Sequence, residues 1–231
     1  MAPSRAAALL AAAALAAFMA RQPLRLWLGD LARGRSAPRT RWAGGVAALL
    51  GAVAIGALLW ASALAAASFW TLMAFAALLL LPQLVYDVRN RGRTLAAELL
   101  GAAGPSALAS AAARASGWRM SEAVALGVIV VARAVPSVLY VRARLRLERG
   151  QWQGGTAVWA SHIAAMGASG ALAVAGLVPW LAFAGVVVLA ARAAHGLSRF
   201  RRASRPQEVG RAEVAMGAAF VALVAVGYRL R

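Results

Sequence analysis

Eight long apolar runs divide this sequence, and they constrain the fold more than any other feature. A hydrocarbon core of roughly 30 Å needs about 20 apolar residues in a helix that rises 1.5 Å per residue. The chain is 62% hydrophobic and only 14% charged, which leaves too little polar surface for a soluble domain of 231 residues. The runs do not alternate apolar and polar residues as the strands of a membrane barrel do. The sequence therefore predicts an all-α, polytopic transmembrane helix bundle.

The predicted spans form a single transmembrane domain over residues 1–231, without a soluble domain or a long linker. The first run also has the form of a secretory signal peptide. Its cleavage would export the arginine-rich loop that follows, so a retained helix is favoured. We expect eight spans, at about residues 6–21, 43–60, 65–86, 95–114, 120–141, 155–174, 177–193 and 211–228.

Arginine placement predicts the orientation of these spans. The chain carries a net charge of +18 and 25 arginines. Four loops, residues 21–42, 87–94, 142–150 and 192–211, hold 19 of them, while the opposite side holds five and Arg133 lies inside a span. The positive-inside rule puts the four loops in the cytoplasm and both termini on the non-cytoplasmic side. Basic loops of this kind favour contact with anionic lipids of the cytoplasmic leaflet over contact with nucleic acid.

The seam between the third and fourth spans reads LVYDVRNRGRTLAAELLGA over residues 84–102. Asp87, Arg89, Asn90 and Arg93 form its charged turn, and Glu98 follows in the first turns of the next span. In one interpretation, Asp87 pairs with a nearby arginine and Glu98 is stabilised at a helix N-terminus. In the other, these groups line a polar pocket that holds a charged head group or a cation, because a carboxylate in a span usually faces a cavity or a partner. The structural interpretation is favoured for Asp87, and both stay open for Glu98.

The fifth span carries a polar stripe. Arg133, Ser137, Tyr140 and Arg144 follow one another at spacings of four, three and four residues, so they share one helix face. Arg142 adds a charge on a neighbouring face. Snorkelling of long side chains to the interface accounts for Arg142 and Arg144. It does not account for Arg133, which lies about 13 Å inside the cytoplasmic end of the span.

The sixth span contributes a histidine at a similar depth. His162 lies about 8 residues inside its cytoplasmic start, roughly level with Arg133. A single histidine in a span is more often a packing residue than a ligand or a proton carrier. The matching depth keeps a functional role for His162 open.

Several kinds of chemistry have no support in the sequence. There is no cysteine, so thiolate metal sites and disulfides are excluded. A P-loop, a GxSxG nucleophile motif, an HExxH zinc motif and a dinucleotide fingerprint are also missing. We predict no metal and no cofactor, and no residue is identified as catalytic.

The order of the polar segments resembles the YwiC-like family of bacterial membrane proteins. The segments are YDVRNRGRTLAAELLGA, RAVPSVLYVRARLR, a histidine in the next span and VGRAEVAMG at the start of the last, and they extend from Arg21 to Gly217. The resemblance implies a multi-pass protein of the bacterial inner membrane and supplies no catalytic residue. Members of the family begin with a further helix that bears a His-Gly-Ala-Trp motif, so this chain is expected to start at the equivalent of their second span.

A weaker similarity, at the level of the fold, relates this plan to the UbiA-like intramembrane prenyltransferases. With the further helix the count would be nine, as in those enzymes. They hold Mg²⁺ and a diphosphate with two Asp-rich clusters. Asp30 and Asp87 are the only aspartates here, so that metal-dependent mechanism is not expected.

Three functions remain open on the sequence. The first is a lipid- or isoprenoid-handling site at the cytoplasmic leaflet, which would bind a lipid-like small molecule. The second is a small transporter or permease, and the third is a non-catalytic accessory subunit. The outer halves of spans two, three, six and seven are almost wholly apolar, which favours a one-sided pocket over a path across the bilayer. The candidate binding residues are Asp87, Arg89, Asn90, Arg93, Glu98, Arg133, Ser137, Tyr140, Arg142, Arg144 and His162.

Overall fold

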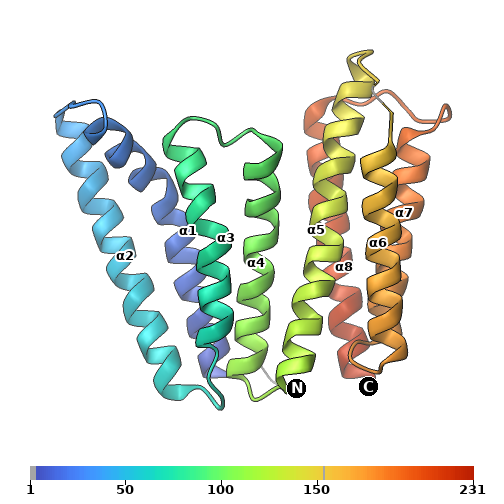
Figure 1. Ribbon diagram of the computed structural model, residues 1–231, viewed down its shortest axis with the longest axis horizontal. Helices are drawn as coiled ribbons and strands as arrows, with labels where there is room; N and C mark the ends of the chain where they lie inside the picture. The colour runs from blue at the N-terminus through green and yellow to red at the C-terminus, as the bar shows by residue number, and fades with distance from the viewer. Residues whose placement is uncertain (1–3, 153) are drawn as a thin grey trace. The chain divides into compact units, whose positions relative to one another are not determined.

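The computed structural model describes residues 4–152 and 154–231, and these residues form eight α-helices and no strand (Figure 1). All eight helices are long and apolar enough to cross a membrane. They are α1 (Arg5–Leu31), α2 (Pro38–Leu64), α3 (Trp70–Val88), α4 (Leu95–Ala115), α5 (Met120–Glu148), α6 (Thr156–Val174), α7 (Trp180–Leu197) and α8 (Pro206–Arg229). The predicted all-α, eight-span fold class is confirmed.

The chain divides into two compact units, one up to Val124 and one from Ala125 onward. In the first unit, α1 packs along α2 and α3 along α4, while α1 also contacts α3 and α4. Its core lies near the start of α1, where Leu10 and Phe69 are buried among alanines. The two connections rich in arginine, residues 32–37 and 89–94, lie at the same end of this unit (Figure 1).

The second unit contains α6, α7, α8 and α5 from Ala125 onward. Its core is formed by small and branched side chains from all four helices, with Ile129 of α5, Val186 of α7 and Phe220 of α8 buried. Alanine and glycine along the helices permit this close packing. Residues 149–152, which follow α5, and the connection 198–205 lie at the same end of this unit (Figure 1). The prediction of one domain over residues 1–231 stays a prediction.

Side chains and prolines in the first turns define several helix starts. The Thr94 hydroxyl accepts a hydrogen bond from the Ala97 amide (3.4 Å) and caps α4. Pro38 and Pro206 occupy the first turns of α2 and α8, where their lack of an N–H donor costs nothing. Gly117 ends α4 with a φ of 91°, a left-handed conformation that suits glycine.

The helices extend beyond several of the predicted spans. The first helix continues through Pro23 to Leu31, ten residues past the predicted end, and α5 reaches Glu148 instead of residue 141. The last helix begins at Pro206, not at residue 211, whereas α3 begins later than predicted, at Trp70. Hydropathy detects the apolar part of a helix, but arginine-rich turns remain helical because arginine has a high helix propensity.

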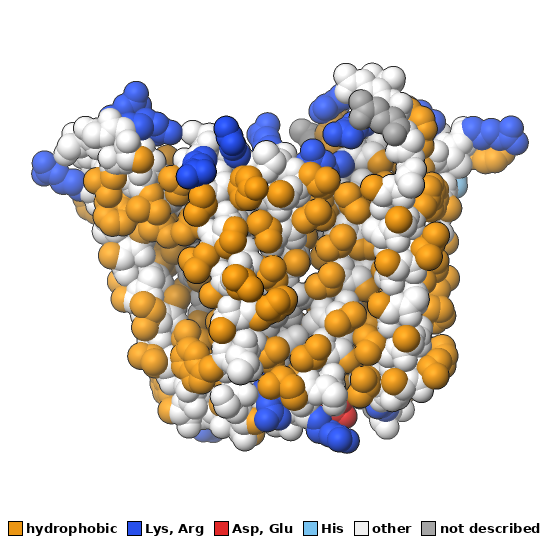
Figure 2. Space-filling view, viewed as in Figure 1, with side chains coloured by type: hydrophobic (Ala, Val, Ile, Leu, Met, Phe, Trp, Pro, Cys, Tyr) orange, Lys and Arg blue, Asp and Glu red, His pale blue; other side chains and the backbone are white. Residues whose placement is uncertain are grey.

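The surface has the distribution expected of a membrane protein. Figure 2 shows hydrophobic side chains along the lengths of the helices and arginines at their ends. Large apolar side chains such as Trp42 (77% exposed) and Leu78 (66% exposed) face outward. Such exposure is stable when the surroundings are lipid instead of water.

Candidate functional site

The charged turn of the first unit is anchored by an ion pair whose carboxylate is buried. Asp87, near the end of α3, accepts two hydrogen bonds from Arg21 of α1, one from Nε (2.5 Å) and one from Nη2 (2.9 Å). The Asp87 side chain is 5% exposed and that of Arg21 is 39% exposed. With its amide oxygen turned toward Arg21, Gln83 accepts further hydrogen bonds at 2.9 and 3.2 Å. The Asp87 carboxylate is therefore paired with an arginine, as the structural interpretation of the motif predicts.

Two glycines leave room for this polar cluster. A Cβ on Gly92 would lie 2.5 Å from Asp87 Oδ1, and a Cβ on Gly101 would collide with the Gln83 amide. The motif over residues 84–102 thus supplies both the polar groups and the space that they occupy.

The other candidates of this motif lie around the end of the first unit. Arg89 follows α3 and is exposed, as is Arg93. Asn90 adopts a positive φ of 55°, and its side-chain oxygen accepts a hydrogen bond from Arg25 (3.2 Å). Glu98 lies in the first turn of α4 and is half-buried.

The polar stripe of α5 turns toward α7 and α8. Arg133 Nη2 donates to the backbone carbonyl of Glu213 on α8 (3.2 Å). Ser137 and Tyr140 are buried, and the Tyr140 ring lies so close to Gly196 of α7 that a Cβ there would collide with it. The four stripe residues therefore share an inward-facing side of α5, as their spacing predicts.

Arg144 is a buried anchor for the connection between α7 and α8. Its side chain is 5% exposed and pairs with Glu148 Oε1 (2.9 Å). Its two Nη groups donate to the backbone carbonyls of Gly196 and Arg202. Snorkelling to the interface, as expected from the sequence, is wrong for Arg144, because its guanidinium is buried and donates charge-assisted hydrogen bonds to carbonyl groups of α7 and of the connection that follows it.

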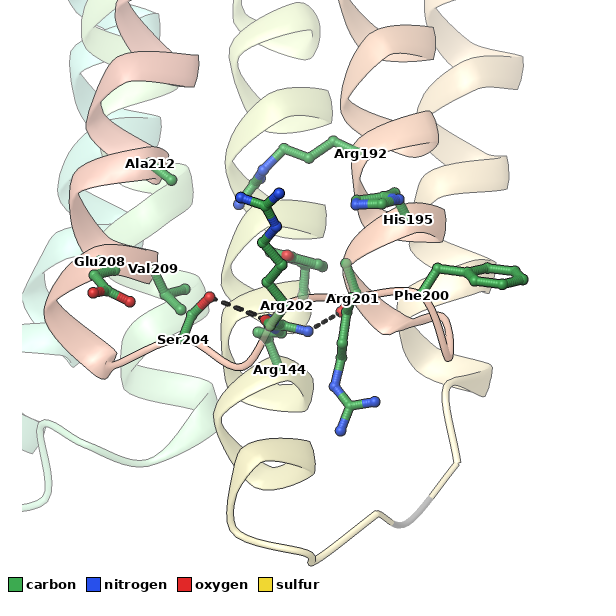
Figure 3. Close-up of a pocket in the computed structure, with 12 residues that line it drawn as sticks. Arg144, Arg192, His195, Phe200, Arg201, Arg202, Ser204, Glu208, Val209 and Ala212 are labelled. Carbon is green, nitrogen blue, oxygen red and sulfur yellow. Dashed lines mark hydrogen bonds between the residues drawn. The ribbon is translucent and has the colours of Figure 1, made fainter.

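A pocket opens at this end of the second unit, beside the Arg144 anchor. It has a volume of about 620 Å³ and lies between α5, α7, α8 and the connection 198–205. Figure 3 shows the side chains of Arg192 and Arg202 directed into the space between α7 and α8. The lining consists of Tyr140, Arg144, Arg192, His195, Gly196, Phe200, Arg201, Arg202, Ser204, Glu208, Val209 and Ala212.

Positive charge dominates the lining. Four arginines face one carboxylate, Glu208, whose Oε2 is already engaged with the backbone N–H of Arg205 (2.9 Å). Arg201 lies 3.6 Å from Glu148, whereas the Arg202 guanidinium has no ion pair within the described residues. Arg202 is exposed, and it is the arginine most available to an anion.

The remaining candidates lie away from this pocket. His162 is 3% exposed in α6, and its Nδ1 lies 2.9 Å from the carbonyl oxygen of Val158, one turn earlier on the same helix. This contact is the one expected of a packing histidine. Arg142 is half-buried on α5 and is not part of the lining.

Most of the pocket residues are absent from the candidates predicted from the sequence. Of that set only Tyr140 and Arg144 line the pocket. The arginine pattern places Arg192 in a loop, yet it lies within α7, about 8 Å before the end of the helix. The sequence signal for this pocket is the second histidine, His195, four residues before the charge-rich segment RFRRASR. Across residues 4–152 and 154–231, no group of three or more His, Cys, Asp or Glu side chains could hold a metal ion.

The fold and the surface define an α-helical, multi-pass integral membrane protein. More specifically, residues 1–113 match the model of the family described as YwiC-like protein, which confirms the resemblance. The match contains α1, α2, α3 and the Arg21–Asp87 pair, while the pocket of the second unit lies beyond it. No curated protein and no solved structure matches the chain.

Proposed function

We propose that the second unit binds the phosphate-bearing head group of a membrane lipid or isoprenoid. The observation that carries this proposal is a pocket lined by four arginines and a histidine, in which Arg202 has no ion pair within the described residues, while Glu148 and Glu213 pair with the other three arginines. An excess of guanidinium groups in a partly enclosed space stabilises an anion, and the planar guanidinium matches phosphate in a bidentate geometry.

The arginines of the pocket differ in how far their guanidinium groups are already engaged, and this difference supports binding of an external anion. The Arg144 guanidinium is occupied by two backbone carbonyls and by Glu148, so it positions the wall of the pocket and is not available to bind a ligand. Arg202 and Arg201 come from the connection, and His195 lies on the last turn of α7. The lining thus receives basic groups from two segments, α7 and the connection 198–205, and Arg202 is directed toward Arg192 in Figure 3.

Apolar side chains at the same pocket favour an amphiphile over a free phosphate. Val209 and Ala212 of α8 belong to the lining, and Phe200 is 71% exposed at its edge. An acyl or prenyl chain attached to the head group would leave along such a surface into lipid. A volume of about 620 Å³ suits a head group and the first part of its chain.

The arginine-rich ends of the helices support a cytoplasmic location for this pocket. The connection 198–205 belongs to the loops that the positive-inside rule assigns to the cytoplasm. We therefore propose that the ligand is taken from the cytoplasmic leaflet of a bacterial inner membrane. Exposed arginines on the other connections would contact anionic lipids of the same leaflet.

The test is extraction of the lipids that co-purify with the protein in a mild, uncharged detergent. Arg202→Leu removes the available guanidinium of the pocket, and Arg211→Leu is the matched control, because Arg211 is exposed on α8 outside the lining. Mass spectrometry is expected to find a phosphate-bearing amphiphile, near one per chain, with wild type and Arg211→Leu and to find it depleted at least fivefold with Arg202→Leu. Identical bulk lipid in all three samples would refute the proposal and favour an accessory role.

A further inference from the structure

One arginine of the pocket is occupied by a carboxylate of the protein itself. Arg192 of α7 lines the pocket and forms an ion pair with Glu213 of α8 through Nη2 and Oε1. The two side chains are 18% and 15% exposed, so the pair is largely shielded from solvent. The guanidinium carbon of Arg192 also lies 4.3 Å from the centroid of the Tyr140 ring.

The backbone of the same residue of α8 is bound by a second arginine, Arg133 of α5. Arg133 Nη2 donates to the Glu213 carbonyl oxygen, and a Cβ on Gly217 would collide with the Arg133 guanidinium. Two arginines therefore contact Glu213: Arg192 binds its carboxylate, and Arg133 binds its backbone carbonyl. The cluster carries an excess positive charge about 10 Å inside the start of α8.

An unpaired guanidinium at this depth would be costly, because the surroundings have a low dielectric constant. Glu213 removes that cost while the pocket is empty. A phosphate group carries more charge than a carboxylate and offers three oxygens, so it competes well for a guanidinium. Val209 and Ala212 lie four residues and one residue before Glu213 on the same helix, and both line the pocket. Glu213 is therefore about one helical turn or less from the pocket wall.

We infer that Glu213 is a displaceable internal counter-ion: it holds Arg192 in the empty pocket and yields it to the phosphate of the incoming amphiphile. This inference rests on the proposed function. It assigns Arg192 as the second guanidinium of the binding site and makes the start of α8 the element that responds to the ligand. The Arg133 contact keeps the backbone of α8 in place while the Glu213 side chain moves.

The experiment measures the affinity of the full-length protein for dodecyl phosphate by calorimetry in an uncharged detergent. Glu213→Gln keeps the side-chain volume and removes the competing charge, so it is expected to bind dodecyl phosphate about tenfold more tightly than wild type. Glu122→Gln makes the same change of net charge at the start of α5, in the other unit, and is expected to leave the affinity unchanged. Arg192→Leu is expected to weaken binding at least tenfold.

A double variant tests whether the gain in affinity comes from competition between Glu213 and the phosphate for Arg192 or only from the change in net charge. Adding Glu213→Gln to Arg192→Leu is expected to give no gain, because the group for which the carboxylate competes has gone. If Glu213→Gln does not fold, Glu213→Asp keeps the charge but shortens the reach to Arg192, and about threefold tighter binding is expected.

The outcomes distinguish the inference from the proposed function. Failure of wild type to bind dodecyl phosphate would refute the proposed function. Binding by wild type that Glu213→Gln and Glu213→Asp leave unchanged or weaken would refute the inference alone, and would assign the Arg192–Glu213 pair to stability. Equal binding of inorganic phosphate and dodecyl phosphate would show that the ligand is a free anion instead of a lipid head group.

Discussion

At the scale of single residues, burial of arginine distinguishes this protein from a simple bundle with basic loops. Arg144 and Arg192 look like interfacial charges in the sequence, yet both are largely buried in the second unit and each has a specific partner. Arg21 in the first unit is more exposed, but it also has a specific partner, the buried carboxylate of Asp87. Pairing of this kind costs stability when one partner is removed, because the other charge remains in a poorly solvated place.

The Arg21–Asp87 pair leads to an asymmetric prediction. Arg21→Leu leaves a carboxylate that is 5% exposed without its partner, whereas Asp87→Leu leaves an arginine that is 39% exposed and can reach water. We expect Arg21→Leu to destabilise the protein by about 2 kcal/mol and Asp87→Leu by about 1 kcal/mol. The double variant should lose less stability than the two single losses together. Thermal unfolding in detergent measures all three, and equal, additive losses would contradict the account.

The contact between Gly196 and Tyr140 gives a second prediction at this scale. A methyl group at Gly196 would collide with the Tyr140 ring, so Gly196→Ala is expected to destabilise the protein by about 1–3 kcal/mol. Gly210 of α8 has open space around its Cβ position, so Gly210→Ala should be neutral or stabilising by up to about 1 kcal/mol. Denaturation midpoints of the two variants provide the comparison. A stable Gly196→Ala protein would mean that α5 and α7 do not approach each other this closely.

At the scale of elements, the connection between α7 and α8 forms one wall of the pocket, and Arg144 holds it. Arg144→Met is expected to loosen residues 198–205, because two backbone carbonyls and the Ser204 hydroxyl lose their donor. Limited trypsin digestion should then cleave at Arg201 or Arg202 several times faster than in wild type. Arg149→Gln, an exposed position just after α5, serves as the control. An unchanged rate of cleavage would exclude the anchoring role.

Sequence reasoning predicts these elements better than their ends or their contacts. The eight apolar runs and the arginine pattern determine the number of helices, because length and hydropathy are local properties. The spacing of Arg133, Ser137, Tyr140 and Arg144 also predicts their common face. By contrast, whether Arg192 belongs to a loop or to a helix depends on the last turns of α7, which hydropathy does not register. Its pairing with Glu213 depends on packing between two helices, which no single segment contains.

At the scale of the whole molecule, the orientation in the membrane is the property that most needs a direct test. The chain contains no cysteine, so a single introduced cysteine is a unique chemical reporter. In cells, Ala203→Cys and Ser36→Cys are expected to resist a membrane-impermeant maleimide, since both lie in arginine-rich connections. Ala66→Cys lies between α2 and α3, and Ala175→Cys lies between α6 and α7. Both positions are at the helix ends away from the arginine-rich connections, so both cysteines should react with the maleimide. The reverse pattern of labelling would invert the topology and move the pocket to the outer face.

The central claim is that the second unit recognises an anionic head group attached to an apolar chain. The most direct measurement is a titration of wild type and Arg202→Leu with dodecyl phosphate and with dodecanol, which carry the same chain with and without the charge. We predict saturable binding of one dodecyl phosphate per wild-type chain, weakened at least tenfold by Arg202→Leu, and no saturable binding of dodecanol. Equal binding of both amphiphiles, or binding of dodecyl phosphate that does not depend on Arg202, would contradict the account.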